Sequence, residues 1–367
     1  MDLKRILKWD SKKISKEIEN RKFEHIDICL NKEVEFKTKT TGFEEIELLH
    51  HALPELDYKK IESNANFFGR SFDYPILING MTGGHEISKK INRVLAQLAS
   101  EYNIPMEVGS QRAALENKDL IDTYRVARDI SGEIFLIGNI GAGQLVDEYR
   151  INEIEACIEM IDANALAIHL NPLQELLQKG GNLNYENLLK KIQEIKKQIK
   201  IPIIVKETGC GLGNTDLKLL KSINIEYIDV CGAGGTSWAT VEAYRYKNDS
   251  IMTSIANNFK NWGIPTIIST ILAVKMGGFN VISSGGIRSG IDIAKAIACG
   301  AGMTGLALPF LKSAYNEDLK ALETKMEILI KELKTCMLLT RSTNLDELKV
   351  AEKIFFGKIK QWLNFYQ

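Results

Sequence analysis

Around residue 170 the sequence gathers side chains that could bind a charged ligand. His169 and Asn171 follow the apolar run Ala165–Ile168, and Gln174 and Glu175 come just after a proline. His169 and Asn171 share a face, because residues two apart on a strand point to the same side. One carboxylate among neutral hydrogen-bonding groups suits Mg²⁺, which needs few protein ligands when phosphate oxygens and water complete its shell. Alternatively, Glu175 only stabilises the first turn of a helix through the helix dipole.

A second position with chemical potential is Lys206, which ends the apolar run Ile201–Val205. A lysine at the end of a buried strand needs an anionic partner, because an unpaired buried ammonium is costly. That partner is either a neighbouring carboxylate or the electron-rich edge of a ligand, such as the N1–O2 side of a flavin. The sequence leaves both alternatives open.

Glycines mark two further places where an anion could bind. Gly285 and Gly286 precede a stretch with helical periodicity, and Ala307 closes the next apolar run. Backbone N–H groups at the start of a helix bind phosphate, and α/β barrels often place such a site after their seventh and eighth strands. The turn at 234–236 adds two glycines and the hydroxyl of Thr236. Read alone, each pattern is also compatible with a turn that has no function.

Cationic residues that could meet an anion occur in two segments. Arg21, Lys22 and His25 form a small cluster near the start of the chain, and Gln111 and Arg112 follow Ser110. Arginine can donate two parallel hydrogen bonds to one anion. Standing alone, the first cluster would be a solvated surface. No P-loop, G-x-S-x-G or H-E-x-x-H motif occurs, so the chemistry of those sites is not indicated.

The elements that must position these residues repeat a single unit, an apolar run of strand length followed by a polar tip and a helical stretch. We expect eight strands, at Pro75–Asn79, Pro105–Val108, Ile134–Ile137, Ala165–Ile168, Ile201–Val205, Tyr227–Val230, Asn280–Ser283 and Met303–Leu306. Continuously apolar strands that alternate with helices are typical of a buried parallel sheet. Helical periodicity is clear at 87–102, 152–162 and 291–299, and we also expect a helix at 266–274.

Eight such units predict an α/β fold, a (β/α)8 TIM barrel with its site at the carboxyl ends of the strands. An open doubly wound sheet is the alternative. We expect one domain, with an N-terminal extension at 1–74, the barrel at 75–310 and C-terminal helices at 311–367. Residues 1–20 suggest a short amphipathic helix. After Pro309 we expect one helix to about Thr340 and another from Leu345 to Phe365, with Asn344 as its N-cap.

Composition narrows the class of protein. The 367 residues include 47 Lys and Arg and 47 Asp and Glu, so no overall field favours nucleic acid or an anionic membrane. The six cysteines form no C-x-x-C pair, which argues against a disulfide framework or zinc site and favours a reducing compartment. No apolar run is long enough to span a bilayer, and no secretory signal is visible. We therefore expect a cytoplasmic protein.

Taken together, these residues resemble the type 2 isopentenyl-diphosphate isomerases, a family of flavin-dependent (β/α)8-barrel enzymes. The resemblance runs from Arg21 to beyond Pro309. It rests on RKFEHI (21–26), LLHHALPEL (48–56), MTGG (81–84), VGSQR (108–112), GNIG (138–141), HLNPLQE (169–175), VKETG (205–209), GGTSW (234–238) and SSGGIRSG (283–290). HLNPLQE and RKFEHI are the specific motifs, because other FMN barrels share the glycine-rich loops.

The resemblance implies roles for residues at the barrel mouth. Those expected to bind FMN are Met81, Thr82, Gly83, Ser110, Asn139, Lys206, Thr236, Gly285, Gly286, Ile287, Ala307 and Leu308. Those expected to meet the substrate are Arg21, Lys22, Ser110, Gln111, Arg112, His169 and Gln174, with His169 and Gln174 at the reacting end. Glu175 would bind Mg²⁺ bridging the diphosphate.

The reaction implied is interconversion of isopentenyl and dimethylallyl diphosphate, a step in isoprenoid biosynthesis. Reduced FMN, recharged by NADPH or NADH, would act as the acid and base, and the protein would form a tetramer or octamer. One rival is another FMN barrel oxidoreductase, of the 2-hydroxy-acid oxidase or dihydroorotate dehydrogenase type. An oxidase of the first kind needs a His base near the sixth tip, and no His follows His169. A non-catalytic flavin-binding barrel is the other rival.

Overall fold

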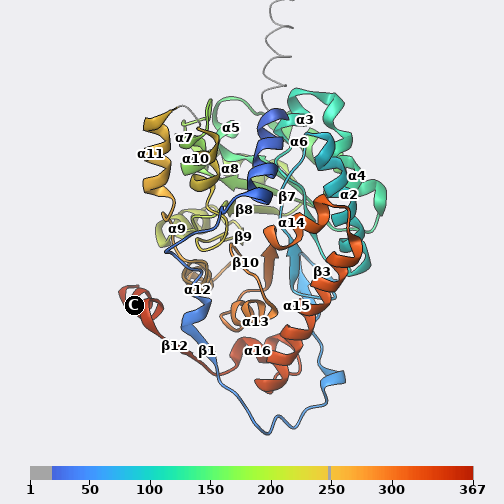
Figure 1. Cartoon of the computed structure of the whole chain (residues 1–367), viewed down its shortest axis with the longest axis vertical. Helices are drawn as coiled ribbons and strands as arrows, with labels where there is room; N and C mark the ends of the chain where they lie inside the picture. Colours follow the sequence, from blue (N-terminus) through green and yellow to red (C-terminus); the bar gives the residue numbers. More distant parts are fainter. Residues whose placement is uncertain (1–18, 247–248, 367) are drawn as a thin grey trace, which may run out of the picture.

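Eight parallel strands close into a barrel in the computed structural model, which describes residues 19–246 and 249–366 (Figure 1). Around the barrel the order is β10-β11-β4-β5-β6-β7-β8-β9, and every neighbouring pair is parallel. The strands are β4 (Ile76–Ile78), β5 (Met106–Glu107), β6 (Leu136–Gly141), β7 (Ala165–Leu170), β8 (Ile203–Glu207), β9 (Tyr227–Asp229), β10 (Asn280–Ser284) and β11 (Met303–Leu306). The predicted TIM barrel is confirmed, and the open-sheet alternative is wrong.

Three strands run further than the apolar pattern indicated. β6, β7 and β8 continue to include Asn139, His169 and Lys206, which we had expected at the tips. The ladder explains the extension, since His169 pairs in register with Gly141 on one side and Lys206 on the other. Backbone pairing therefore fixes the polar side chains, and they are held more rigidly than loop residues would be.

Helices surround the barrel, and most of them bury one face against it. They are α2 (Glu86–Glu101), α3 (Arg112–Glu116), α4 (Asp122–Ile130), α5 (Ala142–Asp147), α6 (Ile151–Ile161), α7 (Pro172–Leu177), α8 (Leu188–Gln198), α9 (Asn214–Ser222), α10 (Trp238–Arg245), α11 (Ser250–Phe259), α12 (Thr266–Met276) and α13 (Gly290–Ala298), with the 3-10 turn η3 at Lys118–Leu120. By contrast, α11 packs on α10. In α6 the buried residues Ile154, Cys157 and Ile161 recur at helical spacing. The helix expected at 266–274 is confirmed as α12, most of which is buried.

The C-terminal part differs from the two predicted helices. The first is divided into α14 (Leu308–Tyr315) and α15 (Leu319–Leu339), because Glu317 adopts a positive φ of 55° and Asp318 caps a new helix. The second is divided into α16 (Leu345–Val350), the short strand β12 (Lys353–Phe355) and α17 (Gly357–Phe365). β12 pairs antiparallel with β1 (Ile46–Leu48), so a tertiary contact overrides the helical pattern there. Asn344 does cap α16, accepting from the Glu347 amide at 3.0 Å.

The N-terminal segment crosses the barrel mouth and then descends its outside. Residues 19–31 are helical, and the predicted helix at 1–20 falls almost wholly outside the described residues. Residues 33–41, which we call the strap, lie on the glycine-rich loops: the Phe36 amide donates to Gly235 O at 3.0 Å and the Ile267 amide to Thr41 O at 3.1 Å. The strap leads to η1 (Phe43–Glu45), β1, η2 (Tyr58–Lys60) and the hairpin of β2 (Ala65–Phe67) and β3 (Arg70–Phe72).

That hairpin closes the amino-terminal end of the barrel. In the hairpin, the ring of Phe68 stacks on that of Phe135, with the ring centroids 4.8 Å apart. The ring of Phe67 packs edge-on against that of Tyr227, with the centroids 5.6 Å apart. Phe135 and Tyr227 lie at the amino ends of β6 and β9. An aromatic plug therefore fills one end of the barrel, and the opposite end is left to receive ligands.

Candidate active site

A large cavity opens at the carboxyl ends of the strands. Its empty space, counted out to its open mouth, is about 1600 Å³. The residues that line it come from the ends of β4, β6, β7, β8, β10 and β11 and from the helix at 19–31. This end of a (β/α)8 barrel carries the active site in enzymes of the fold.

Most of the residues predicted for the site line this cavity together. They are Arg21, Lys22, Met81, Thr82, Ser110, Arg112, Asn139, His169, Gln174, Glu175, Lys206, Thr236, Gly285, Gly286, Ala307 and Leu308. They are spread over nearly 290 positions in the chain, and closure of the barrel brings them into one space.

Three predicted residues do not line the cavity. Gln111 is fully buried in the barrel wall, where its amide donates to Cys157 O at 2.8 Å and accepts from the Asn139 amide at 2.9 Å. Its side chain is therefore held inside the barrel wall and does not reach the cavity. Gly83 packs against the Tyr124 ring, which leaves no room for a Cβ. Ile287 lies in the core, so only its backbone could contribute to a site.

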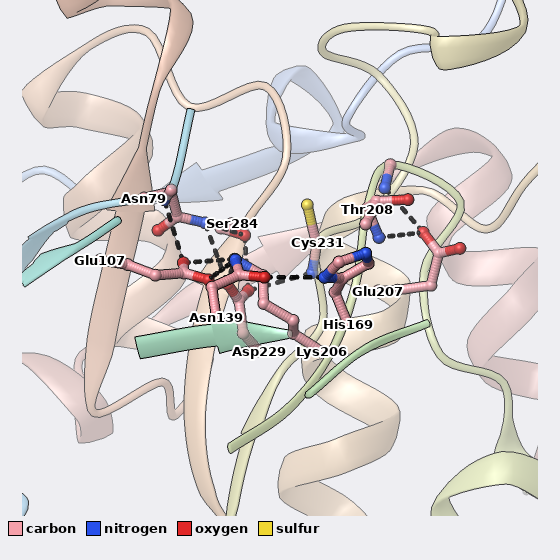
Figure 2. A network of polar contacts seen from close by, with 12 residues as sticks. Asn79, Glu107, Asn139, His169, Lys206, Glu207, Thr208, Asp229, Cys231 and Ser284 are labelled. Carbon is pink, nitrogen blue, oxygen red and sulfur yellow. Dashed lines mark hydrogen bonds and ion pairs between the residues drawn. The ribbon is translucent and has the colours of Figure 1, made fainter. Parts of the chain in front are cut away.

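A continuous polar network forms the floor of the cavity (Figure 2). His169 Nδ1 lies 2.7 Å from Asn139 Oδ1, and Asn139 Nδ2 donates to Glu107 Oε1 at 2.5 Å. The other oxygen of Glu107 accepts from Lys206 Nζ at 2.5 Å. Four side chains from β5, β6, β7 and β8 are thus joined in one chain of hydrogen bonds.

Lys206 confirms the first alternative left open by the sequence, a salt bridge to a neighbouring carboxylate. It also lines the cavity, and its place beside a ligand stays a prediction. Burial by itself lowers the pKa of its ammonium group. Glu107 and Asp229 outweigh that effect and raise the pKa above its usual value. Lys206 is therefore a permanent, fixed cation.

His169 has the opposite electrostatic character. Burial lowers the pKa of its imidazole to about 3, and the charges of Lys206 and Lys22 act in the same direction. The ring is accordingly neutral at ordinary pH, and it can bind or orient a ligand without carrying charge.

Arg21, Lys22 and Arg112 make one rim of the cavity cationic. Desolvation, together with Arg21 and Arg112, lowers the pKa of Lys22 to about 7. Arg112 is held in place by Glu116, whose Oε1 accepts from its Nε at 2.8 Å. Arg112 also lies 3.8 Å from Glu148 Oε2. Three clustered cationic groups, with two carboxylates beside Arg112, suit a multiply charged anion.

The helix that supplies Arg21 and Lys22 is anchored by a buried ionic cluster. His25 Nε2 lies 2.9 Å from Glu242 Oε1, and Arg245 donates to the other oxygen of Glu242 at 2.7 Å. The imidazole of His25 also packs edge-on against Trp238 at 5.2 Å. Glu242 has no exposed surface. Its position on α10 therefore sets where the covering helix lies.

Glu175 lies in the first turn of α7, as the helix-dipole alternative expected. Its carboxylate also forms part of the cavity wall. It accepts from the Asn182 amide at 2.7 Å and from Asn171 Nδ2 at 3.1 Å. Asn171 Oδ1 is buried and has no partner within the described part of the chain. The described residues contain no cluster of three or more His, Cys, Asp or Glu suited to a metal. One carboxylate and one amide oxygen leave most of a metal's coordination shell to ligand and water.

The glycine-rich loops approach one another so closely that side chains are excluded. A Cβ on Gly285 would lie 2.2 Å from Gly232 O, and one on Gly286 would lie 2.4 Å from the Thr41 methyl group. Both glycines have positive φ, 99° and 86°. The loop leads into α13, where Ser289 and Asp292 form a capping box. The combination leaves exposed backbone beside a helix N-terminus, which suits a phosphate group.

Sequence reasoning missed several residues of the site. Glu107 and Asp229 lie inside predicted strands, and a carboxylate within an apolar run was the signal that could have found them. His25 was named only as part of the N-terminal cationic cluster, and it lines the cavity together with Arg21, which is four residues earlier on the same helix. Trp238 and Asn79 line the cavity without any signal that distinguishes them from core or turn residues.

No helix among residues 19–246 and 249–366 has the length and apolar character needed to cross a membrane.

Comparisons with known proteins agree with this geometry. The family model described as FMN-dependent dehydrogenase matches residues 14–120 and 177–353. The isopentenyl-diphosphate delta-isomerase of Methanothermobacter thermautotrophicus is 45% identical over 350 residues, 95% of this chain and 96% of the relative. That of Methanocaldococcus jannaschii is 45% identical over 356 residues, 95% and 97% of the two chains.

Solved structures of similar fold have more distant sequences. A flavocytochrome b2 superposes with a TM-score of 0.66 at 18% identity, over 96% of this chain and 87% of that one. A mandelate oxidase superposes with a TM-score of 0.61 at 15% identity, over 90% and 95%. These likenesses concern the fold alone, whereas the family model and the archaeal relatives concern the sequence. The chain therefore belongs to the FMN-dependent dehydrogenase family and, within it, to the isopentenyl-diphosphate delta-isomerases.

Proposed function

We propose that this protein interconverts isopentenyl diphosphate and dimethylallyl diphosphate, using reduced FMN with Mg²⁺ and NADPH or NADH as the source of electrons. The observation that carries the proposal is that one cavity contains both a cationic rim and a glycine-rich phosphate cradle. The two parts suit the diphosphate of a substrate and the phosphate of a flavin, held over the same polar floor.

The residues present fit FMN. Gly285 and Gly286 line the cavity with backbone alone, because the neighbouring loops leave no room for a Cβ, and Lys206 offers a fixed cation for the pyrimidine edge of the ring. Met81, Thr82, Ser110, Asn139 and Thr236 line the space between them. When bound, reduced FMN would supply the acid and base at its N5 position that a double-bond shift requires.

The diphosphate end would be held by Arg21, Lys22 and Arg112. Glu175 and the unpartnered oxygen of Asn171 would bind Mg²⁺, whose remaining ligands would be diphosphate oxygens and water. A metal that needs a full set of protein ligands would not suit this donor set. Each charged hydrogen bond to the diphosphate would contribute about 1.5–3 kcal/mol.

The hydrocarbon end would lie against neutral groups. His169 is neutral because its pKa is low, and Gln174 offers an amide whose oxygen already accepts from Asn171 at 3.3 Å. Neither group competes for a proton at ordinary pH, so their role would be to orient the double bond. The helix at 19–31 would exclude water above it.

The main rival is an oxidoreductase of the 2-hydroxy-acid oxidase type, whose fold this chain shares. Such an enzyme needs a titratable His beside the cofactor near the end of β9. In this chain the titratable side chain that follows β9 is Cys231, and burial raises the pKa of its thiol, so it stays protonated. The last histidine of the chain is His169.

The deciding experiment is anaerobic. The protein is incubated with FMN, dithionite, Mg²⁺ and isopentenyl diphosphate in D₂O, and the products are followed by proton NMR. We expect dimethylallyl diphosphate containing deuterium, formed only when the flavin is reduced and Mg²⁺ is present. Folded, flavin-loaded protein that forms no such product would overturn the isomerase proposal in favour of an oxidoreductase, and protein that cannot take up FMN would overturn the flavin assignment.

A further inference from the structure

Lys206 lies between two buried carboxylates. Its Nζ is 2.5 Å from Glu107 Oε2 and 3.4 Å from Asp229 Oδ2. None of the three side chains is more than 6% exposed. One cation therefore faces two anions in a region that water hardly reaches, where charges act on one another strongly.

The contacts of Glu107 are those of an ionised carboxylate. Besides Lys206, it accepts from the Gly80 amide at 3.0 Å and from Asn139 Nδ2 at 2.5 Å. All of these groups donate, and hydrogen bonds of this kind stabilise the charged form.

Asp229 is surrounded by donors in the same way. It accepts from Asn79 Nδ2 at 2.9 Å, from Ser284 Oγ at 2.5 Å and from the Cys231 amide at 3.1 Å. Figure 2 shows Glu107 and Asp229 close to Lys206 in the same polar network.

The cluster thus carries one positive and two negative charges. His169, joined to it through Asn139, adds none because burial lowers its pKa to about 3. The Cys231 thiol adds none because burial raises its pKa. The cluster of Lys206, Glu107 and Asp229 therefore has a net charge of one negative unit, whereas the lysine alone would be positive.

We infer that Glu107 and Asp229 cancel the charge of Lys206 and so lower the reduction potential of the bound flavin. The inference rests on the proposed function, which places the FMN pyrimidine edge at Lys206. Reduction adds electron density to that edge, which a cation favours and a net negative cluster disfavours.

The sign of the effect separates this role from a structural one. If Glu107 served only to hold Lys206 in place, its removal would let the cation move away, and the potential would fall. If Glu107 acts through its charge, its removal leaves a more positive floor, and the potential rises. Glu107→Gln and Asp229→Asn each remove one charge and keep the shape of the side chain.

The test is an anaerobic potentiometric titration of the FMN-loaded protein. We expect both variants to raise the midpoint potential of the flavin by about 30 mV or more. For a two-electron reduction, that shift corresponds to a tenfold change in the equilibrium constant. Ser284→Ala is the matched control, because it removes a hydrogen bond to Asp229 without changing the charge, and it should leave the potential unchanged. Glu107→Asp keeps the negative charge, so its midpoint potential should equal that of the wild type.

An unchanged or lower potential in the two amide variants, with FMN bound, would overturn the inference. If Glu107→Gln does not fold, Asp229→Asn decides alone. Failure of the wild-type protein to bind FMN would instead count against the proposed function, so the two failures are distinguishable.

Discussion

The imidazole Nδ1 of His169 lies 2.7 Å from the side-chain oxygen of Asn139. The amide of Asn139 cannot be reversed, because its nitrogen donates to Glu107. His169 must therefore carry its proton on Nδ1, and Nε2 is left as a hydrogen-bond acceptor. One fixed amide thus sets the tautomer of the histidine.

From this relationship we predict that His169 does not titrate during catalysis. Burial lowers its pKa to about 3, so the ring stays neutral at every pH above about 4. In ¹⁵N NMR of histidine-labelled protein, the His169 signal is the one that disappears in His169→Asn. In the wild-type protein that signal should keep the neutral Nδ1–H pattern from pH 5 to 9. A protonation step inside that range would contradict the assigned tautomer and its environment.

Lys22 should make diphosphate binding depend on pH. The pKa of its ammonium group is lowered to about 7, so above pH 7 the empty site holds mainly neutral Lys22, which must take up a proton when an anion binds. Affinity should weaken as the pH rises from 7 to 9, and calorimetry in buffers of different ionisation enthalpy should detect the uptake. Lys22→Met should weaken binding by about 1.5–3 kcal/mol, roughly ten- to 150-fold, and remove the proton uptake. The exposed Lys32, changed to Met, is the control. Uptake that persists in Lys22→Met would assign it to another group.

Glu175→Gln should abolish turnover and leave the flavin bound. The amide keeps the hydrogen-bonding shape of the carboxylate but loses the charge that Mg²⁺ needs, so we expect at least a hundredfold loss of activity that excess Mg²⁺ does not restore. FMN absorbance of the purified variant should equal that of the wild type. Glu155→Gln, on the exposed face of α6, should be without effect. Normal turnover in the Glu175 variant would refute the metal assignment.

Gly286→Ala should weaken FMN binding at least tenfold, as measured by fluorescence titration. Its new Cβ would meet the Thr41 methyl group at 2.4 Å and the Gly234 carbonyl carbon at 2.8 Å, which would displace the strap. Gly277→Ala is the matched control, since Gly277 also has a positive φ but has open space around its Cβ. That control should cost about 1–2 kcal/mol of unfolding free energy and leave FMN affinity intact. Equal FMN affinity in the two variants would mean that the cradle tolerates the side chain.

Glu242→Gln should detach the covering helix. The carboxylate is buried and accepts from both His25 and Arg245, and breaking a buried ionic pair typically costs about 3–5 kcal/mol. We expect faster hydrogen exchange in the described helix at 19–31 and weaker diphosphate binding, with FMN affinity retained. The exposed Glu226, changed to Gln, serves as the control. Unchanged exchange in that helix would show that other contacts hold it.

The barrel could be predicted from the sequence because each strand is an apolar run with a polar end. The pattern gave no register, however, and register decides which strand residues face inward. For that reason Glu107 and Asp229 were absorbed into predicted strands, although a carboxylate in such a run signals a buried partner. Gln111 was assigned to the site for the same reason, since its neighbours Ser110 and Arg112 line the cavity and it alone points into the wall.

The prediction of one helix from Leu345 to Phe365 was wrong for a different reason. Residues 345–365 have helical spacing, and nothing local records that Lys353–Phe355 will meet a strand near the other end of the chain. A contact between residues some 300 positions apart cannot be inferred from a window of twenty.

The pairing of β1 with β12 also orders events during synthesis. The ribosome makes every strand of the barrel before it reaches β12, so β1 waits without its partner while the barrel assembles. β1 follows directly after the strap, and the strap carries the helix that covers the mouth. The sheet that joins the two ends of the chain is therefore completed last, after all eight barrel strands and the α10 residues that hold the covering helix have been made.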